Sequence, residues 1–432
     1  MHKKIFLLSL PLILSNLVLP MVGIVNTALI GHLSDSNYLA AIGLGVSIIN
    51  VICFMFSFFR MSLTGLIAQS LNNLEKMLEI VIKAVLIALL ISIIVFSFKS
   101  VILIAVLKIV NTSVDIKMLL AKFYNVAICI LFFSLLNYIF IGFFIGVGNP
   151  RVVLYSSIIY MSVAIGLSTL LVVILNYNVV GVAISLVIAS ASCSIYLSTK
   201  IFRYFYRSGN FSIKKLVDFK LLNLDSYMSF LQLNINIFVR SLCLLLAFNS
   251  FYIFSSSYGK TILAANTILV EIGMFFAMFL DALANTTESL VAQAYVDKNT
   301  SLLRETIYKT FVQSMILTLV LSLVYFSFSG YIVSIFTDIV DVKIQINKYI
   351  IFSFLMPLFA SFSFWIDGVF VGLLKTVAMR NAMILSAGVY IASVFLLQPY
   401  ENYGLWIALI LFYIARTVFL MPPLGQYIKK GV

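Results

Sequence analysis

Residues 85–98 read VLIALLISIIVFSF, an unbroken apolar run whose pattern decides the class of fold. A membrane-spanning β-strand alternates polar and apolar side chains over about ten residues, and this run does not alternate. The run at 158–175 does not alternate either. Because backbone polar groups in lipid must be satisfied within the segment or within a closed barrel, we predict that these runs are transmembrane helices.

The composition of the whole chain points the same way. Of its 432 residues, 63% are apolar and 10% are charged, and the mean hydropathy is +1.14. Soluble domains are about 45–50% apolar and about 25% charged. A soluble protein of this composition would expose large apolar patches, which argues against soluble enzymes and nucleic-acid-binding proteins. At about 20 residues per crossing, the roughly 272 apolar residues suffice for about twelve helices.

We therefore predict an all-α polytopic membrane protein whose helices form two six-helix bundles. The predicted spans are 5–31, 38–71, 78–107 (interrupted by Lys99), 118–147, 152–175, 179–206, 227–254, 262–295, 306–329, 346–374, 380–397 and 403–425. They divide into an N-terminal lobe (1–207), a basic cytoplasmic linker (208–226) and a C-terminal lobe (227–432).

The basic residues predict the orientation. Most lysines and arginines outside the spans fall on the same side as the N-terminus, which places both termini in the cytoplasm. The net charge of +13 is then explained by topology and by contact with anionic lipid, and no nucleic-acid partner is expected. The four cysteines form no CxxC pair and have no nearby histidine, so we expect neither a metal site nor a cofactor.

The two lobes resemble each other in sequence. At a shift of 224 residues, Leu39-Ala40-Ala41 matches Leu263-Ala264-Ala265, and Leu66-Ile67-Ala68-Gln69 matches Leu290-Val291-Ala292-Gln293. At a shift of 226, Gly142-x-Phe144-x-Gly146 matches Gly368-x-Phe370-x-Gly372. Six spans per half make this a parallel repeat, an arrangement typical of transporters that work by alternating access. A static two-bundle receptor or scaffold is the alternative.

Four acidic residues are assigned to the predicted spans, and all four lie in the second half: Glu271, Asp281, Glu288 and Asp367. Carboxylates inside a membrane commonly bind a proton or a cation that is moved. Each of the four is therefore a candidate for ion coupling, with Glu271 the weaker one. The alternative for each is a structural pair with an arginine or a helix end.

Three arginines also lie within the predicted spans: Arg60, Arg240 and Arg416. Long basic side chains at such positions serve as counter-ions or extend toward the membrane surface. We expect these roles for the three, in preference to substrate binding.

Several motifs occur in order along the chain. The first span has Leu10-Pro11-Leu12-Ile13-Leu14-Ser15-Asn16, then Pro20-x-x-Gly23, then Asn26-Thr27-Ala28-Leu29-Ile30-Gly31; the second has Arg60-Met61-Ser62-Leu63-Thr64-Gly65. The second half has Leu280-Asp281-Ala282, Ala292-Gln293-Ala294-Tyr295, Asp367-Gly368-Val369-Phe370-Val371-Gly372, Met379-Arg380-Asn381 and Ala415-Arg416. Together they resemble the multidrug and toxic compound extrusion (MATE) family, in particular its DNA-damage-inducible protein F (DinF) branch.

The resemblance implies a V-shaped pair of six-helix lobes that exports organic, often cationic, amphiphilic compounds against an inward proton or sodium gradient. It implies a monomer, not an enzyme, in a bacterial inner membrane. In this branch the first helix bends, which Pro11, Pro20 and Gly23 would permit here.

The sequence departs from the family at its N-lobe acids. The family's first-span Asp is Asn26 here, and its fifth-span Asn-x-x-x-Asp pattern corresponds to Ala164 and Ser168. None of these side chains titrates near neutral pH. We therefore expect coupling through the C-lobe carboxylates.

Three alternatives stay open. A flippase for lipid-linked saccharides would show several cationic residues facing the cavity. A membrane enzyme would need a nucleophile or base, for which His32 is the one histidine beyond the N-terminus. A paralogue that has lost transport would explain the missing N-lobe acids.

Overall fold

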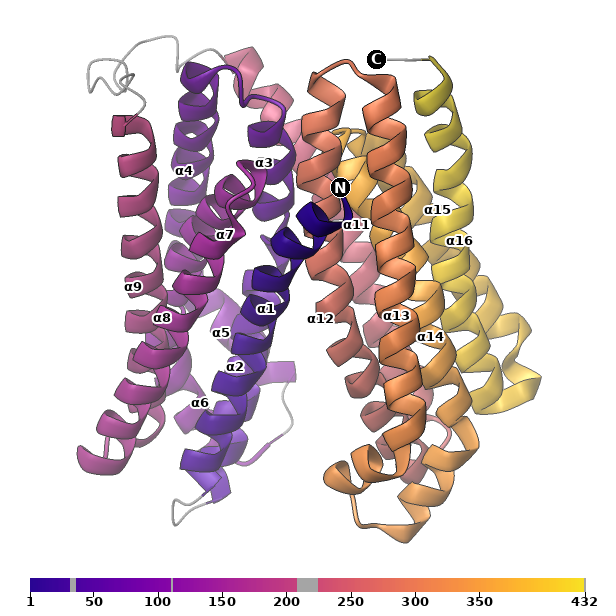
Figure 1. Ribbon diagram of the computed structural model, residues 1–432. Helices are drawn as coiled ribbons and strands as arrows, with labels where there is room; N and C mark the ends of the chain where they lie inside the picture. The colour runs from indigo at the N-terminus through magenta and orange to yellow at the C-terminus, as the bar shows by residue number, and fades with distance from the viewer. Residues whose placement is uncertain (32–35, 110–111, 208–223, 431–432) are drawn as a thin grey trace. The chain divides into compact units, whose positions relative to one another are not determined.

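The computed structural model describes residues 1–31, 36–109, 112–207 and 224–430 (Figure 1). Within these ranges, 11 helices are long and apolar enough to cross a membrane. The number is up to 12 if a pair bent by 46°, Val114–Ala127 and Ile130–Gly146, counts as one span. The predicted all-α class is confirmed.

Nine α-helices and one π-helical segment are described in the first half of the chain. They are α1 (His2–Gly31), α2 (Ser36–Met55), α3 (Phe58–Ala68), α4 (Leu74–Ser97), α5 (Lys99–Ile109), α6 (Val114–Ala127), α7 (Ile130–Gly146), α8 (Pro150–Ser168), η1 (Thr169–Ile174) and α9 (Asn178–Arg207).

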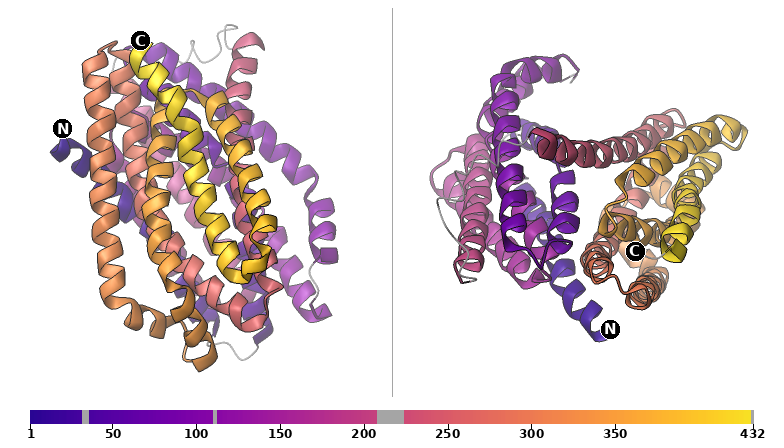
Figure 2. Two further views of the ribbon diagram at one scale, coloured as in Figure 1. Left: turned by 90° about the vertical axis from the view of Figure 1, so that its right-hand side faces the viewer. Right: turned by 90° about the horizontal axis from the view of Figure 1, so that it is seen from above.

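The second half contains fewer and longer helices. They are α11 (Leu224–Ser256), α12 (Lys260–Val296), α13 (Thr300–Phe336), α14 (Val340–Gly372), α15 (Thr376–Leu396), the short 3₁₀ turn η3 (Gln398–Tyr400) and α16 (Glu401–Lys430). Figure 2 shows α12 to α16 from the side and nearly end-on, running along a common direction as a bundle.

The described helices group into two compact units. The N-terminal unit is Leu14–Ser229, and the C-terminal unit is Phe230–Val432 together with Met1–Ile13. The first residues join the C-terminal unit because Ile5 is buried against Leu283 and Leu290, while Gln313 Nε2 donates to the His2 carbonyl at 2.9 Å. Most of the predicted linker, residues 208–223, lies outside the described residues, as does His32.

Two of the predicted spans are interrupted in the N-terminal unit. The span expected at 38–71 breaks between α2 and α3, where the amides of Phe56 and Ser57 bond carbonyls three residues back instead of four. The span expected at 118–147 bends between α6 and α7. Residues Asn37–Ala68 still form one candidate span across the first break, whereas the second bends the helix by 46°. The interruption predicted within 78–107 is also present, between α4 and α5.

Two charged residues of the predicted span 78–107 lie inside α4. Lys83 is 3% exposed and forms an ion pair with Glu79 one turn earlier. Glu79 falls within the predicted span 78–107, so the statement that all span acids lie in the second half is wrong. A lysine is found in a helix of this kind because a carboxylate at i−4 offsets its charge.

The first helix, α1, contains both prolines in its interior. A proline has no amide hydrogen, so Pro11 and Pro20 each leave one backbone carbonyl without its helical bond. A Cβ added at Gly23 would meet nothing within 4 Å, so packing does not require glycine there. The bend of this helix stays a prediction.

Glycines allow a close helix contact in the N-terminal unit, between α3 and α7. A Cβ added at Gly142 would lie 2.6 Å from the Arg60 carbonyl oxygen, and one at Gly146 would lie 2.9 Å from that of Thr64. Only hydrogen fits in these places, so the two backbones approach closely through a small-xxx-small pattern.

The C-terminal unit repeats this contact between α12 and α14. A Cβ added at Gly368 would lie 2.6 Å from the Ala284 carbonyl oxygen, and one at Gly372 would lie 2.7 Å from that of Glu288. The glycines are related by the 226-residue shift and their partners by the 224-residue shift. The internal repeat predicted from the sequence is thus confirmed in the packing.

Gly368→Ala is expected to destabilise the protein by about 1–3 kcal/mol, because the added methyl group overlaps the Ala284 carbonyl. Gly388→Ala is the matched control, since a Cβ there meets nothing within 4 Å and alanine favours the helix. Thermal unfolding of the purified protein in detergent compares the two. Equal midpoints for both variants would contradict the close contact.

Candidate functional site

A cavity of about 600 Å³ lies within the N-terminal unit. Its walls come mainly from α1, α2, α7, α8 and α9. Most wall atoms are aliphatic or aromatic, and polar groups are added by asparagines, serines, a threonine and tyrosines. No Asp, Glu, Lys, Arg or His is among the residues that line this cavity. It is therefore an apolar site with uncharged hydrogen-bonding groups, typical of pockets for organic molecules.

Asn26 is the one family acid position that lines this cavity. Its side chain is 6% exposed, and its Oδ1 has no hydrogen-bond donor among the described residues. A buried acceptor without a donor is costly, so a ligand or water with an N–H or O–H group would be favoured beside it. Ser15, also on α1, lines the cavity too, and its hydroxyl is 2.5 Å from that of Ser157 on α8.

The other two family positions do not line the cavity. Ala164 and Ser168 are both fully buried, and the Ser168 hydroxyl lies 2.6 Å from that of Ser185. The π-helical segment η1 begins directly after Ser168. At this place, where the family has an acid, the structure has a closed hydroxyl pair that serves packing.

In the C-terminal unit, two of the predicted acids lie along one side of α12. Asp281 and Glu288 are seven residues apart, and Asn285 lies in the turn between them. The Asn285 Nδ2 donates to Asp281 Oδ2 at 3.1 Å. Glu288 is 1% exposed, whereas Glu271 on the same helix is exposed. The arrangement supplies several oxygen atoms that could bind a proton or a small cation.

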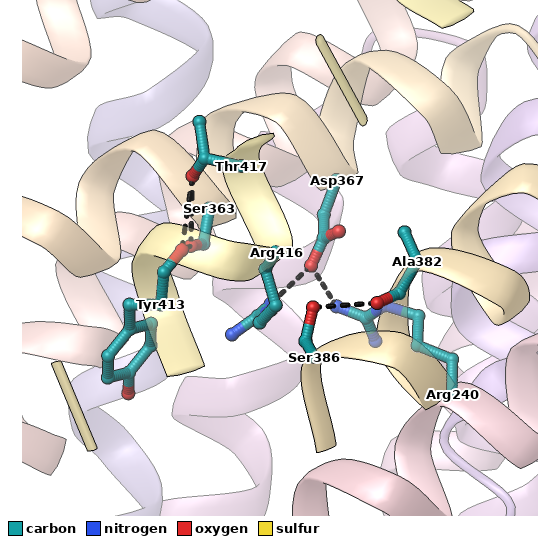
Figure 3. A network of polar contacts seen from close by, with 8 residues as sticks. All are labelled: Arg240, Ser363, Asp367, Ala382, Ser386, Tyr413, Arg416 and Thr417. Atoms are coloured by element: carbon teal, nitrogen blue, oxygen red, sulfur yellow. Dashed lines mark hydrogen bonds and ion pairs between the residues drawn. The ribbon is translucent and has the colours of Figure 1, made fainter. Parts of the chain in front are cut away.

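Asp367 lies on α14 next to the glycine that contacts α12. It accepts a hydrogen bond from Arg416 Nη2 at 2.5 Å and a second from Arg240, both to its Oδ2 (Figure 3). All three side chains are buried, and they come from α11, α14 and α16. For Asp367 the structure thus shows the alternative predicted from the sequence, a carboxylate paired with arginine. Two guanidinium groups are paired with this one carboxylate, so Asp367 serves as their shared counter-ion.

Arg60, the third predicted buried arginine, lies on α3 of the N-terminal unit. It is half-buried, and its carbonyl accepts from Thr64 Oγ1 at 2.9 Å as well as facing Gly142. Its backbone lies at the contact of α3 with α7, and the counter-ion role expected of its side chain stays a prediction.

The repeat places unlike groups at equivalent positions of the two units. Ser57, the counterpart of Asp281 at the 224 shift, lies in the break between α2 and α3. Ile141, the counterpart of Asp367 at the 226 shift, lines the N-terminal cavity. The N-terminal unit thus has a helix break and a cavity wall where the C-terminal unit has carboxylates.

A polar network that was not predicted from the sequence lies one helical turn from Arg240. Arg380 Nη1 donates to Asn236 Oδ1 at 2.9 Å, and Asn236 Nδ2 donates to Thr376 Oγ1 at 3.2 Å. The i, i+4 spacing of Asn236 and Arg240 within an apolar helix was the available signal, because buried polar groups need partners.

Comparison with known proteins matches both halves of the chain to one family. The MatE family model matches residues 11–170 and 237–396. The chain is 28% identical over 431 residues to DNA damage-inducible protein F of Escherichia coli (strain K12), covering 99% of this chain and 93% of the relative.

Solved structures share the fold at low sequence identity. An outward-facing multidrug resistance MATE family transporter of the MOP superfamily has a TM-score of 0.86 at 16% identity, covering 99% of this chain and 96% of that one. A MOP superfamily transporter from Pyrococcus furiosus Vc1 (DSM3638), described as having a binding pocket of reverse polarity, has a TM-score of 0.83 at 15% identity, with 99% and 96% covered.

Proposed function

Because the chain belongs to the MatE family of membrane transporters, we propose that it is a secondary active exporter of amphiphilic organic compounds, driven by an inward proton or sodium gradient. The observation that carries the proposal is that the two units differ in their buried polar groups. The N-terminal unit has a neutral cavity of organic-molecule size, and the C-terminal unit has the buried carboxylates.

In this proposal the N-terminal cavity binds the exported compound. Its aliphatic walls remove apolar surface from water, and Asn26 accepts a hydrogen bond. The lipid-saccharide flippase is not favoured, since such a protein needs cationic groups in its cavity and none lines this one.

The coupling ion binds in the C-terminal unit, at Asp281 and Glu288. These two acids lie on one side of α12, with the amide of Asn285 between them. Asp367 is less suited because two arginines hold it, and Glu271 is less suited because it is exposed. The protein acts as a monomer in the cytoplasmic membrane with both termini inside, and it catalyses no covalent chemistry.

The test is transport by the purified protein in proteoliposomes, with pH and sodium gradients imposed separately. A fluorescent organic cation and an uncharged fluorescent amphiphile serve as substrates. We expect concentrative transport under one gradient and none without a gradient, against empty liposomes as control. Movement of a labelled lipid-linked saccharide without organic-compound transport would replace this proposal with the flippase.

A further inference from the structure

Arg416 has more hydrogen-bond donors than acceptors around it. Its Nη2 donates to Asp367, but its Nε and Nη1 are buried and have no acceptor among the described residues. The side chain is 2% exposed. Figure 3 shows one nitrogen of this guanidinium on the side away from Asp367, with no dashed line drawn to it. Charged donors buried without acceptors are costly, so an acceptor is expected there.

The surrounding protein does not supply that acceptor. Asp367 is shared with Arg240, so one carboxylate faces two guanidinium groups. The rings of Phe364, Phe412 and Tyr413 lie 6.0, 5.6 and 5.5 Å from the Arg416 Cζ. Ring faces attract a cation, but they offer no acceptor to in-plane N–H groups.

A third arginine lies nearby in the same unit. Arg380 bonds Asn236, which precedes Arg240 by four residues on α11, a rise of about 6 Å along the helix. Positive charge therefore continues from Arg380 toward Arg240 and Arg416. Three arginines placed in this way attract an anion.

We propose that Arg416 binds a compact anionic group, a halide or a carboxylate, on the side of its guanidinium that faces away from Asp367. The donors on that side are the N–H groups of Nη1, which have no acceptor among the described residues and give the anion charge-assisted hydrogen bonds. The anion supplies the missing acceptor and completes the charge balance of the cluster. This site lies in the C-terminal unit, apart from the neutral cavity, and its existence does not require the proposed transport function.

The test is thermal unfolding of the purified protein in neutral detergent at constant sodium concentration. Bulky gluconate is replaced stepwise by chloride, bromide or acetate. A ligand that binds only the folded state raises the midpoint in a saturable way. We expect this rise in the wild type and its loss in Arg416→Met, which keeps the Arg240–Asp367 pair. Lys343→Met, a change at a partly exposed lysine paired with Asp338, is the control that keeps the response.

Asp367→Asn gives a second and opposite readout. Removing the competing carboxylate frees both guanidinium groups, so the apparent anion affinity should rise at least about tenfold. Bromide in crystals of the wild type should give an anomalous signal within hydrogen-bond distance of Arg416.

The choice of anion separates two sources. A response to halides alone identifies a resident inorganic ion, and affinity that grows with carboxylate chain length identifies the head group of a transported compound; either supports the site. Equal midpoints in all salts, or a full response in Arg416→Met, would overturn it.

Discussion

Asp367→Asn lowers the free energy of unfolding by about 3–5 kcal/mol, which is the expected cost of removing one partner from a buried ion pair. The change keeps the shape of the side chain but leaves Arg240 and Arg416 facing a neutral amide. Both arginines are buried, so water cannot replace the lost charge. Unfolding of the purified protein in detergent, with gluconate as the anion, measures the loss.

Arg416→Met is the matched control for this prediction. It leaves one guanidinium, that of Arg240, paired with Asp367. The expected loss is therefore smaller, about 1–2 kcal/mol, from hydrogen bonding and packing. A larger loss in Arg416→Met than in Asp367→Asn would show that the carboxylate is not what stabilises the cluster.

The double change Asp281→Asn with Glu288→Gln is expected to abolish concentrative transport. It replaces both coupling carboxylates by amides of the same shape, and amides do not take up protons or bind cations strongly. Downhill movement of the organic compound should persist, because the N-terminal cavity is unchanged. Proteoliposome transport with and without an imposed ion gradient distinguishes the two kinds of movement.

Glu271→Gln controls for the loss of one acid from the same helix. Glu271 is exposed on α12, away from the buried acids. Its variant should transport against a gradient as the wild type does. If Glu271→Gln alone abolished concentrative transport, coupling would have to be reassigned to Glu271.

The spans and the repeat were predictable because both depend on local pattern. Long apolar runs indicate where the helices lie, since only a helix or a barrel satisfies the backbone in lipid. The glycine pairs Gly142–Gly146 and Gly368–Gly372 supported the repeat in the sequence, and the structure shows why glycine is needed there, since the backbones of neighbouring helices meet at these residues. The carbonyls that they contact follow only from the fold.

The helix breaks were not predictable from composition. No glycine or proline occurs between Gly45 and Gly65, yet α2 ends at Met55 and α3 begins at Phe58. The ion pair of Lys83 with Glu79 was not predictable either, because a charge within an apolar run can be a loop signal or half of an i, i+4 pair. The fold decides between these outcomes.

The partners of the buried acids also depend on the fold. Arg240 is 127 residues from Asp367 in sequence and Arg416 is 49 residues away, and no spacing indicates that both bond one oxygen. The sequence predicted that these arginines are counter-ions, but their partner follows only from the packing of α11, α14 and α16. The role of Asp367 in coupling stays a prediction.

The central claim is that ion coupling lies in the C-terminal unit and not at the N-terminal position where the family has an acid. The most direct test measures, in proteoliposomes, how many ions move in the opposite direction for each organic molecule transported. The variants compared are Asn26→Ala and the double variant Asp281→Asn, Glu288→Gln, called the pair variant. The account predicts an unchanged counterflux per molecule in Asn26→Ala and none in the pair variant. Counterflux that is kept in the pair variant and lost in Asn26→Ala would contradict it.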